Sequence, residues 1–90
     1  MIVVSPSVTF TATCEQAPSG LVGEIGVEIV QDDTTITART TDDIGEYPND
    51  SGLYYATLVA PSTPGRCRIV WSLPSPSGPS DYASEDLAVE

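Results

Sequence analysis

The side chains of this 90-residue chain that could take part in chemistry are adjacent carboxylates, three arginines and two cysteines. Carboxylates stand in pairs at Asp32-Asp33, Asp42-Asp43 and Glu85-Asp86. Carboxylate oxygens are the ligands that Ca²⁺ prefers, but no EF-hand spacing or other calcium motif organises these pairs. We therefore interpret them as solvated loop residues, with calcium binding as the alternative, and we expect no cofactor.

The composition lacks the residues on which most enzymes depend. There is no histidine, which is the commonest general base and metal ligand. The three basic residues, Arg39, Arg66 and Arg68, are all arginines, so Schiff-base lysines and a P-loop are excluded. Serines are plentiful, but no G-x-S-x-G elbow surrounds any of them. We predict that the chain is not an enzyme.

The charge of the chain is strongly one-sided, with 13 acidic and 3 basic residues and a net charge of −10. Such a chain cannot neutralise a row of phosphates, so we expect no binding to nucleic acid or to anionic membranes. Residues 1–4 lack the basic and long apolar regions of a signal peptide, and no apolar run approaches the roughly 20 residues of a membrane span. We therefore expect synthesis in the cytoplasm, without secretion. The acidic charge favours either solubility alone or a basic protein partner.

These side chains must be positioned by β-strands, because no window of the sequence shows helical periodicity. Residues 52–73 are the most informative stretch: two runs of alternating apolar residues flank a segment at 60–65 that is rich in proline and glycine. A third clean alternation occupies 7–14. The predicted core consists of the large apolar residues on one side of these strands, namely Phe10, Tyr54, Leu58, Ile69 and Trp71.

The pattern predicts an all-β fold, a single immunoglobulin-like antiparallel β-sandwich of six to seven strands that spans residues 1–90. One sheet would contain strands at 2–4, 7–14 and 52–60. The other would contain strands at 34–41, 24–31, 65–73 and 85–90. We expect a two-residue turn at Asp32-Asp33, an edge strand at 34–41, an irregular crossing at 42–51 and a loop at 74–80.

Strand 65–73 carries the feature that most resembles a binding surface. Its arginines, Arg66 and Arg68, should point outward, and the neighbouring strands should present Glu24, Glu28, Asp86 and Glu90 beside them. Cross-strand pairs of opposite charge stabilise a sheet by roughly 0.2–1 kcal/mol each. The arrangement is therefore either a solubilising charge ladder or an oriented docking face, whose candidate residues are Arg66, Arg68, Glu24, Glu28 and the outward-pointing Tyr55.

Longer stretches of the sequence carry a family resemblance. GLYYATLVAP at 52–61 and PGRCRIVW at 64–71 resemble a hairpin of small immunoglobulin-like modules. Together with GLVGEIGV at 20–27, TARTT at 37–41 and EDLAV at 85–89, they resemble small virion-associated proteins of actinobacterial tailed phages. The resemblance covers most of the chain and rests on framework positions. It implies a non-enzymatic structural protein of the particle, located in the virion on the capsid, at the head–tail connector or in the tail.

Two other classes of function are compatible with the sequence. One is a carbohydrate- or host-surface-binding module, which would need grouped exposed aromatic residues, whereas the single Trp is predicted to lie in the core. The other is a free-standing inhibitor or adaptor. The expected partners in the leading interpretation are other virion proteins, and a homo-oligomer remains open.

The two cysteines are predicted to be free thiols. Cys14 ends strand 7–14, whereas Cys67 lies near the start of strand 65–73, and these strands should run in the same direction in facing sheets. The offset is about five residues, or roughly 16 Å at 3.3 Å per residue. A disulfide needs Cα atoms within about 7 Å of each other, so we expect two buried, unbridged thiols.

Overall fold

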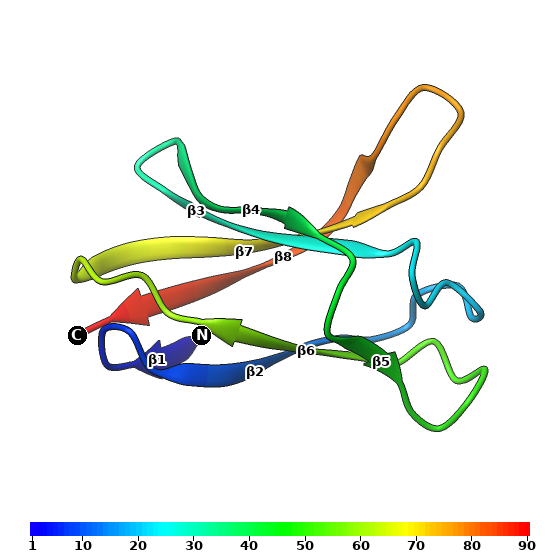
Figure 1. Ribbon diagram of the computed structural model, residues 1–90, viewed down its shortest axis with the longest axis horizontal. Coiled ribbons are helices and arrows are strands. Elements are labelled where there is room, and N and C mark those ends of the chain that lie inside the picture. Colours follow the sequence, from blue (N-terminus) through cyan, green and yellow to red (C-terminus); the bar gives the residue numbers. More distant parts are fainter.

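The computed structural model describes residues 1–90 and consists of β-strands joined by turns and loops, without a helix. The eight strands are β1 (Ile2–Val4), β2 (Thr9–Cys14), β3 (Gly26–Gln31), β4 (Thr34–Thr40), β5 (Ile44–Glu46), β6 (Tyr54–Val59), β7 (Gly65–Leu73) and β8 (Ser80–Val89). They form a five-stranded sheet in the order β1-β8-β7-β3-β4 and a three-stranded sheet in the order β2-β6-β5. Figure 1 shows the sheets as two layers, with the β7–β8 loop projecting beyond them.

The two sheets enclose one hydrophobic core because each strand alternates apolar and polar residues. On β6, Tyr54, Ala56 and Leu58 are buried, whereas Tyr55, Thr57 and Val59 are exposed. Ile25 and residues from both sheets join a single cluster. Of the predicted core residues, the structure buries Tyr54, Leu58, Ile69 and Trp71, while Phe10 is only partly buried and packs against the cluster. The indole Nε1 of Trp71 is the one buried side-chain polar atom without a hydrogen-bond partner.

The position of β1 differs from the sequence prediction. We expected strand 2–4 beside strand 7–14, in an antiparallel sandwich. Instead, β1 pairs in parallel with β8 at the edge of the larger sheet, with Ile2 opposite Leu87 and Val4 opposite Val89. The cause lies in the four residues between β1 and β2, where Pro6 cannot donate to a ladder and Ser7 adopts a φ of 62°. These residues carry the chain from one layer to the other.

The number and extent of the strands also differ from the prediction. The irregular crossing expected at 42–51 contains β5, because Ile44 can be buried there and pair with Ala56 of β6. The last strand begins at Ser80 rather than at residue 85. It follows β7 along its whole length as a hairpin partner, with Tyr82 left unpaired as a bulge between Asp81 and Ala83. The sandwich therefore has eight strands, not six or seven.

Two predictions about the β3–β4 hairpin are confirmed. Asp32 and Asp33 form the two-residue connection between β3 and β4, with φ values of 51° and 61°. A two-residue hairpin turn matches the twist of its two strands when both central residues have positive φ. Asp tolerates this conformation. Strand β4 lies at the edge of the larger sheet, as expected.

Candidate functional site

The outer face of the five-stranded sheet is organised around β7, which lies between β3 and β8. Alternation along β7 buries Cys67, Ile69 and Trp71 and leaves Arg66 and Arg68 exposed on the opposite side. Arg68 lies opposite Asp86 of β8 and Val30 of β3. The guanidinium groups of Arg66 and Arg68 form no hydrogen bond within the chain, in contrast to that of Arg39. These two cations are therefore free to bind another molecule.

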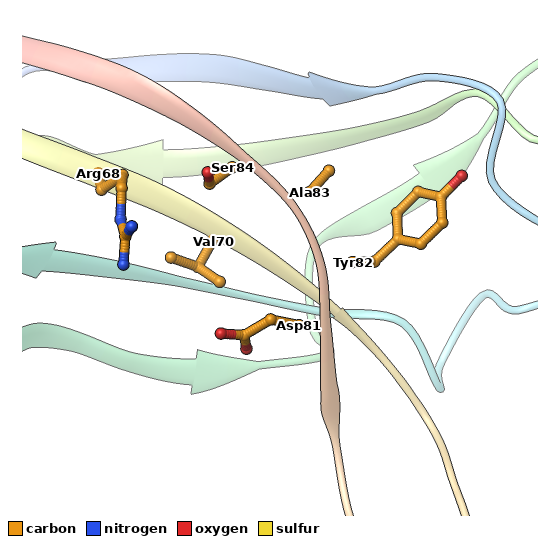
Figure 2. A pocket seen from close by; sticks show the side chains of 6 residues that line it. All are labelled: Arg68, Val70, Asp81, Tyr82, Ala83 and Ser84. Carbon is orange, nitrogen blue, oxygen red and sulfur yellow. The ribbon is translucent and has the colours of Figure 1, made fainter.

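Arg68 separates two shallow hollows on this face. The first, of about 400 Å³, is acidic apart from its arginines, and its lining comprises Val30, Asp32, Asp33, Arg66, Cys67, Arg68 and Asp86. The second, of about 300 Å³, lies along the β7–β8 hairpin and is lined by Arg68, Val70, Asp81, Tyr82, Ala83 and Ser84. Figure 2 shows Arg68 and Asp81 on the same side of the hairpin with Val70 between them, while Tyr82 points away. The result is a broad surface of alternating charge, with a short apolar floor at Val70.

The other candidate docking residues are divided between two faces. Glu28 lies on β3 opposite Val70, diagonal to Arg68, and is half-buried. Glu24 precedes β3 and is exposed. Tyr55, however, belongs to β6 and projects from the outer face of the three-stranded sheet. The prediction of one face containing Tyr55 and both arginines is therefore wrong, because their strands belong to different sheets and point outward in opposite directions.

The third arginine has a structural position that the sequence pattern did not reveal. Arg39 leaves β4 and extends across β3 to β7, where its Nε donates to Ser72 Oγ at 2.6 Å. Its Nη2 donates to the carbonyl of Glu24 at 3.0 Å. The guanidinium lies over Gly26, where any Cβ would overlap it. The absence of a side chain at Gly26 is therefore what leaves room for the Arg39 guanidinium.

Segment 15–25, which links the two sheets, is held from the three-stranded sheet as well. The Tyr54 hydroxyl donates to the Pro18 carbonyl at 2.6 Å and accepts from the Leu21 N–H at 3.0 Å. The Glu46 carboxylate accepts from Gly20 N at 3.1 Å and from Gly52 N at 2.8 Å. Burial is the main cause that raises the pKa of Tyr54, so its hydroxyl stays protonated and available as a donor. These contacts give the loop beside the site a defined conformation.

The two cysteines are free thiols, as predicted. Cys14 lies opposite Tyr54, whereas Cys67 lies opposite Gln31 and Leu87 in the other sheet. Burial raises the pKa of both thiols, and the nearby charges of Glu15 and Asp32 add to the effect at Cys14 and Cys67 respectively. A buried thiol with a raised pKa is a weak nucleophile. Both cysteines act here as small apolar residues of the core.

The outer face of the three-stranded sheet is uncharged. Its outward-pointing residues come from all three strands and are Thr9, Thr11, Thr13, Gly45, Tyr55, Thr57 and Val59. In a chain with a net charge of −10, this is a distinct surface. The two outer faces of the sandwich therefore differ in chemistry: one carries arginines among carboxylates, and the other carries hydroxyl, methyl and aromatic groups.

The acidic pairs do not gather into a metal site: no group of three or more carboxylate, thiol or imidazole side chains is placed to hold a metal ion. The chain also contains no helix that could cross a membrane. Comparison with known proteins gave no match, whether to a family model, to a curated protein or to a solved structure.

Proposed function

We propose that this chain is an immunoglobulin-like, non-enzymatic structural protein of a tailed bacteriophage particle. In this proposal it docks onto another virion protein through Arg66 and Arg68. The immunoglobulin-like type is supported by the strand order. The order β2-β6-β5 matches that of the strands lettered B, E and D in immunoglobulin domains. The order β8-β7-β3-β4 matches that of the strands lettered G, F, C and C′. The virion role is supported by the sequence resemblance.

The observation that carries the docking role is the pair of unpartnered arginines. Both guanidinium groups are exposed and form no hydrogen bond in the chain, although Asp32, Asp33 and Asp86 line the same hollow. Arginine is favoured at interfaces because its planar guanidinium binds carboxylates and stacks on aromatic rings. Acidic side chains around the pair would repel a uniformly acidic partner. The expected partner therefore presents a carboxylate or a carbonyl cluster, with basic residues beside it that meet Asp32, Asp33 and Asp86.

The experiment is to purify phage particles and measure the copy number of this chain by mass spectrometry. A copy number close to that of the major capsid protein would indicate capsid decoration, and one matching a ring would indicate the connector or tail. Absence of the chain from intact particles, or retention of duplex DNA at physiological salt, would contradict the proposal.

The docking face is tested separately by incorporation of variants. The double variant Arg66→Ser/Arg68→Ser makes the chain more negative by two charges, and we expect its incorporation to fall at least about tenfold, the loss that 1.4 kcal/mol of binding free energy produces. The matched control is Ser19→Asp/Ser62→Asp, which makes the same change of charge at exposed loop positions. Equal incorporation of both variants would show that the arginines are not the contact.

A further inference from the structure

The four edge strands of the two sheets are not equally protected against pairing with another chain. β1 and β5 are only three residues long. β4 is irregularly paired with β3 at two positions. Short length, bulges and charges are the usual devices that prevent edge-to-edge association. β2 has none of them: its six residues, TFTATC, contain no charge and no proline and pair with β6 in unbroken register.

The unpaired side of β2 presents its backbone groups in a regular array. Ala60 N donates to Val8 O at 2.8 Å, so Val8 and Ala60 form a hydrogen-bonded pair. Hydrogen-bonded and non-hydrogen-bonded pairs alternate along antiparallel strands. The N–H and C=O groups of Thr9, Thr11 and Thr13 therefore point away from β6, toward the open edge. Their threonine side chains lie on the uncharged outer face.

The charge distribution identifies a second copy of the same chain as a fitting occupant of this edge. Two copies with a net charge of −10 repel each other over most of their surfaces. β2 and the uncharged face beside it are the region where this repulsion is least. An isologous contact brings the same patch of both copies together, so the patch must tolerate itself. A strand of alternating threonines does so, because Thr–Thr cross-strand pairs are favourable.

We infer that β2 pairs antiparallel with β2 of a second copy, about a two-fold axis that passes between the two Thr11 residues. Thr11 then faces Thr11 of the other copy, and Thr9 faces Thr13. All three are residues whose backbone groups point to the edge, so each pair exchanges both of its N–H···O bonds. The two three-stranded sheets become one continuous six-stranded sheet.

The same register keeps the flanking acids apart. Glu15 follows the end of β2, and in this pairing it faces Ser7 of the second copy rather than Glu15. The two Glu15 residues lie at opposite ends of the paired strands, separated by about eight residues or roughly 27 Å. That distance is well beyond the Debye length of about 8 Å at physiological ionic strength. The contact therefore joins two acidic chains without opposing their carboxylates.

Phe10 supplies an independent reason for a partner at this edge. It points inward from β2 as Ala12 and Cys14 do, yet it alone of the three is left partly exposed by the core of its own chain. In the inferred pairing, Phe10 faces Ala12 of the second copy, whose small side chain leaves room for the ring. The dimer thus buries the aromatic surface that the single chain leaves open.

The first test measures mass against concentration. Pairing along a six-residue strand buries less surface than the roughly 800 Å² per partner of a standard interface. We therefore expect a dimer that dissociates in the micromolar range. Sedimentation equilibrium from about 1 μM to about 1 mM should show the mass rising from the 9.5 kDa of one chain toward twice that value. Added salt should strengthen the dimer by screening its acidic surfaces. A mass that stays at one chain over the whole range would overturn the inference.

Two lysine variants distinguish edge pairing from stacking of the uncharged faces. Thr11→Lys places like charges at the two-fold axis, and we expect the dissociation constant to rise at least about tenfold, the change that 1.4 kcal/mol produces. Thr57→Lys is the matched control, because Thr57 lies opposite Thr11 on β6 and is exposed on the same face, but away from the edge. It should leave the dimer intact. Equal weakening by both variants would mean that the faces stack and the inference is wrong.

Amide hydrogen exchange provides a readout that needs no variant. In a concentrated sample the amides of Thr9, Thr11 and Thr13 should be protected, and dilution should release them. The amides of Phe10 and Ala12, which point to β6, should stay protected at both concentrations. Fast exchange at Thr9, Thr11 and Thr13 in the concentrated sample would contradict the pairing, even where the lysine variants fail to fold.

Discussion

Segment 15–25 is held from both sheets, and two of its attachments, those of Tyr54 and Arg39, differ in exposure to water. The completely buried Tyr54 forms the inner attachment, with part-buried hydrogen bonds to Pro18 and Leu21. The half-buried Arg39 forms the outer attachment, with a part-buried hydrogen bond to Ser72 of β7 and an exposed one to Glu24 of the segment. Water replaces a lost partner more easily where the hydrogen bond is exposed, and a polar group that is shielded from water bears the desolvation cost when it loses its partner. The same number of hydrogen bonds should therefore contribute more stability on the Tyr54 side.

A glycine lies next to each attachment, Gly52 on the Tyr54 side and Gly26 on the Arg39 side, and the two differ in what a Cβ would meet. Gly52 has a φ of 77°, and a Cβ there would overlap the backbone carbonyl of Ala17. Gly26 is crowded only by the flexible end of the Arg39 side chain. A backbone atom held in the interior cannot give way, whereas a guanidinium can swing into solvent. The comparison thus predicts a graded series of costs, which the following substitutions test.

The largest effect is expected from Gly52→Ala. The left-handed conformation costs a non-glycine residue about 1–2 kcal/mol, and overpacking costs about 1–3 kcal/mol more. We therefore expect a loss of about 2–5 kcal/mol in the free energy of unfolding, measured by urea denaturation. Gly20→Ala, with a φ of 78° and open space around it, should show the conformational part alone. Gly45→Ala, which is free of both constraints, is the control, and a loss there equal to that of Gly52→Ala would refute the explanation.

Tyr54→Phe should have the next largest effect. The substitution keeps the ring but leaves the Pro18 carbonyl and the Leu21 N–H without their partner. A buried unsatisfied group costs about 1–3 kcal/mol, and we expect a loss in that range. Tyr55→Phe is the matched control, because Tyr55 is the next residue on the same strand, exposed and without a hydrogen bond in the chain. It should change stability by less than about 0.5 kcal/mol.

Wild type and Tyr54→Phe should also differ in how their free energy of unfolding depends on pH above 10. Burial raises the folded-state pKa of Tyr54 above its unfolded value of about 10. As the pH rises past 10, the unfolded chain releases a proton that the folded chain retains, so the free energy of unfolding falls. Tyr54→Phe lacks this loss, and the stability gap between wild type and variant should therefore narrow above pH 10. A gap that stays constant there would show that Tyr54 does not titrate as an enclosed hydroxyl.

The sequence was most informative where alternation and burial coincide. Strand 65–73 was predicted with its observed limits, because a nine-residue run that begins at Gly65, directly after Pro64, leaves one way to place Ile69 and Trp71 inside. The placement of β1 was wrong because three apolar residues can be buried at the edge of either sheet. Alternation within a strand does not say which sheet receives it, and that choice depends on the turn at Pro6 and Ser7.

The candidate site was predictable only in part. The outward direction of Arg66 and Arg68 follows from the period of β7, and their neighbours Glu28 and Asp86 follow from the strand order. Tyr55 was misassigned because it shares the outward direction of its strand but not the sheet. Arg39 and Glu46 make contacts between residues far apart in sequence, at separations from 6 to 33. No local pattern encodes such contacts.

The smallest effect is expected on the Arg39 side, and a double-mutant cycle can isolate it. If Gly26 is small only to admit the Arg39 guanidinium, Gly26→Ala should displace that side chain and cost about 1 kcal/mol through its lost hydrogen bonds. In an Arg39→Ala background the obstacle is gone. Alanine is favoured over glycine inside a strand by roughly 0.5–1 kcal/mol, so the same substitution should then be neutral or stabilising. Two neighbouring residues that share a contact are expected to be non-additive in this way.

Gly23→Ala is the internal control for this cycle. Gly23 lies in the same segment with a φ of 90° and nothing within 4 Å of a Cβ. Its substitution should cost the same in both backgrounds, because its strain belongs to the backbone and does not involve Arg39. If Gly26→Ala behaves like Gly23→Ala, with one cost regardless of residue 39, then the outer attachment is not what requires glycine at position 26. The contrast between the inner and outer attachments would then rest on Tyr54 and Gly52 alone.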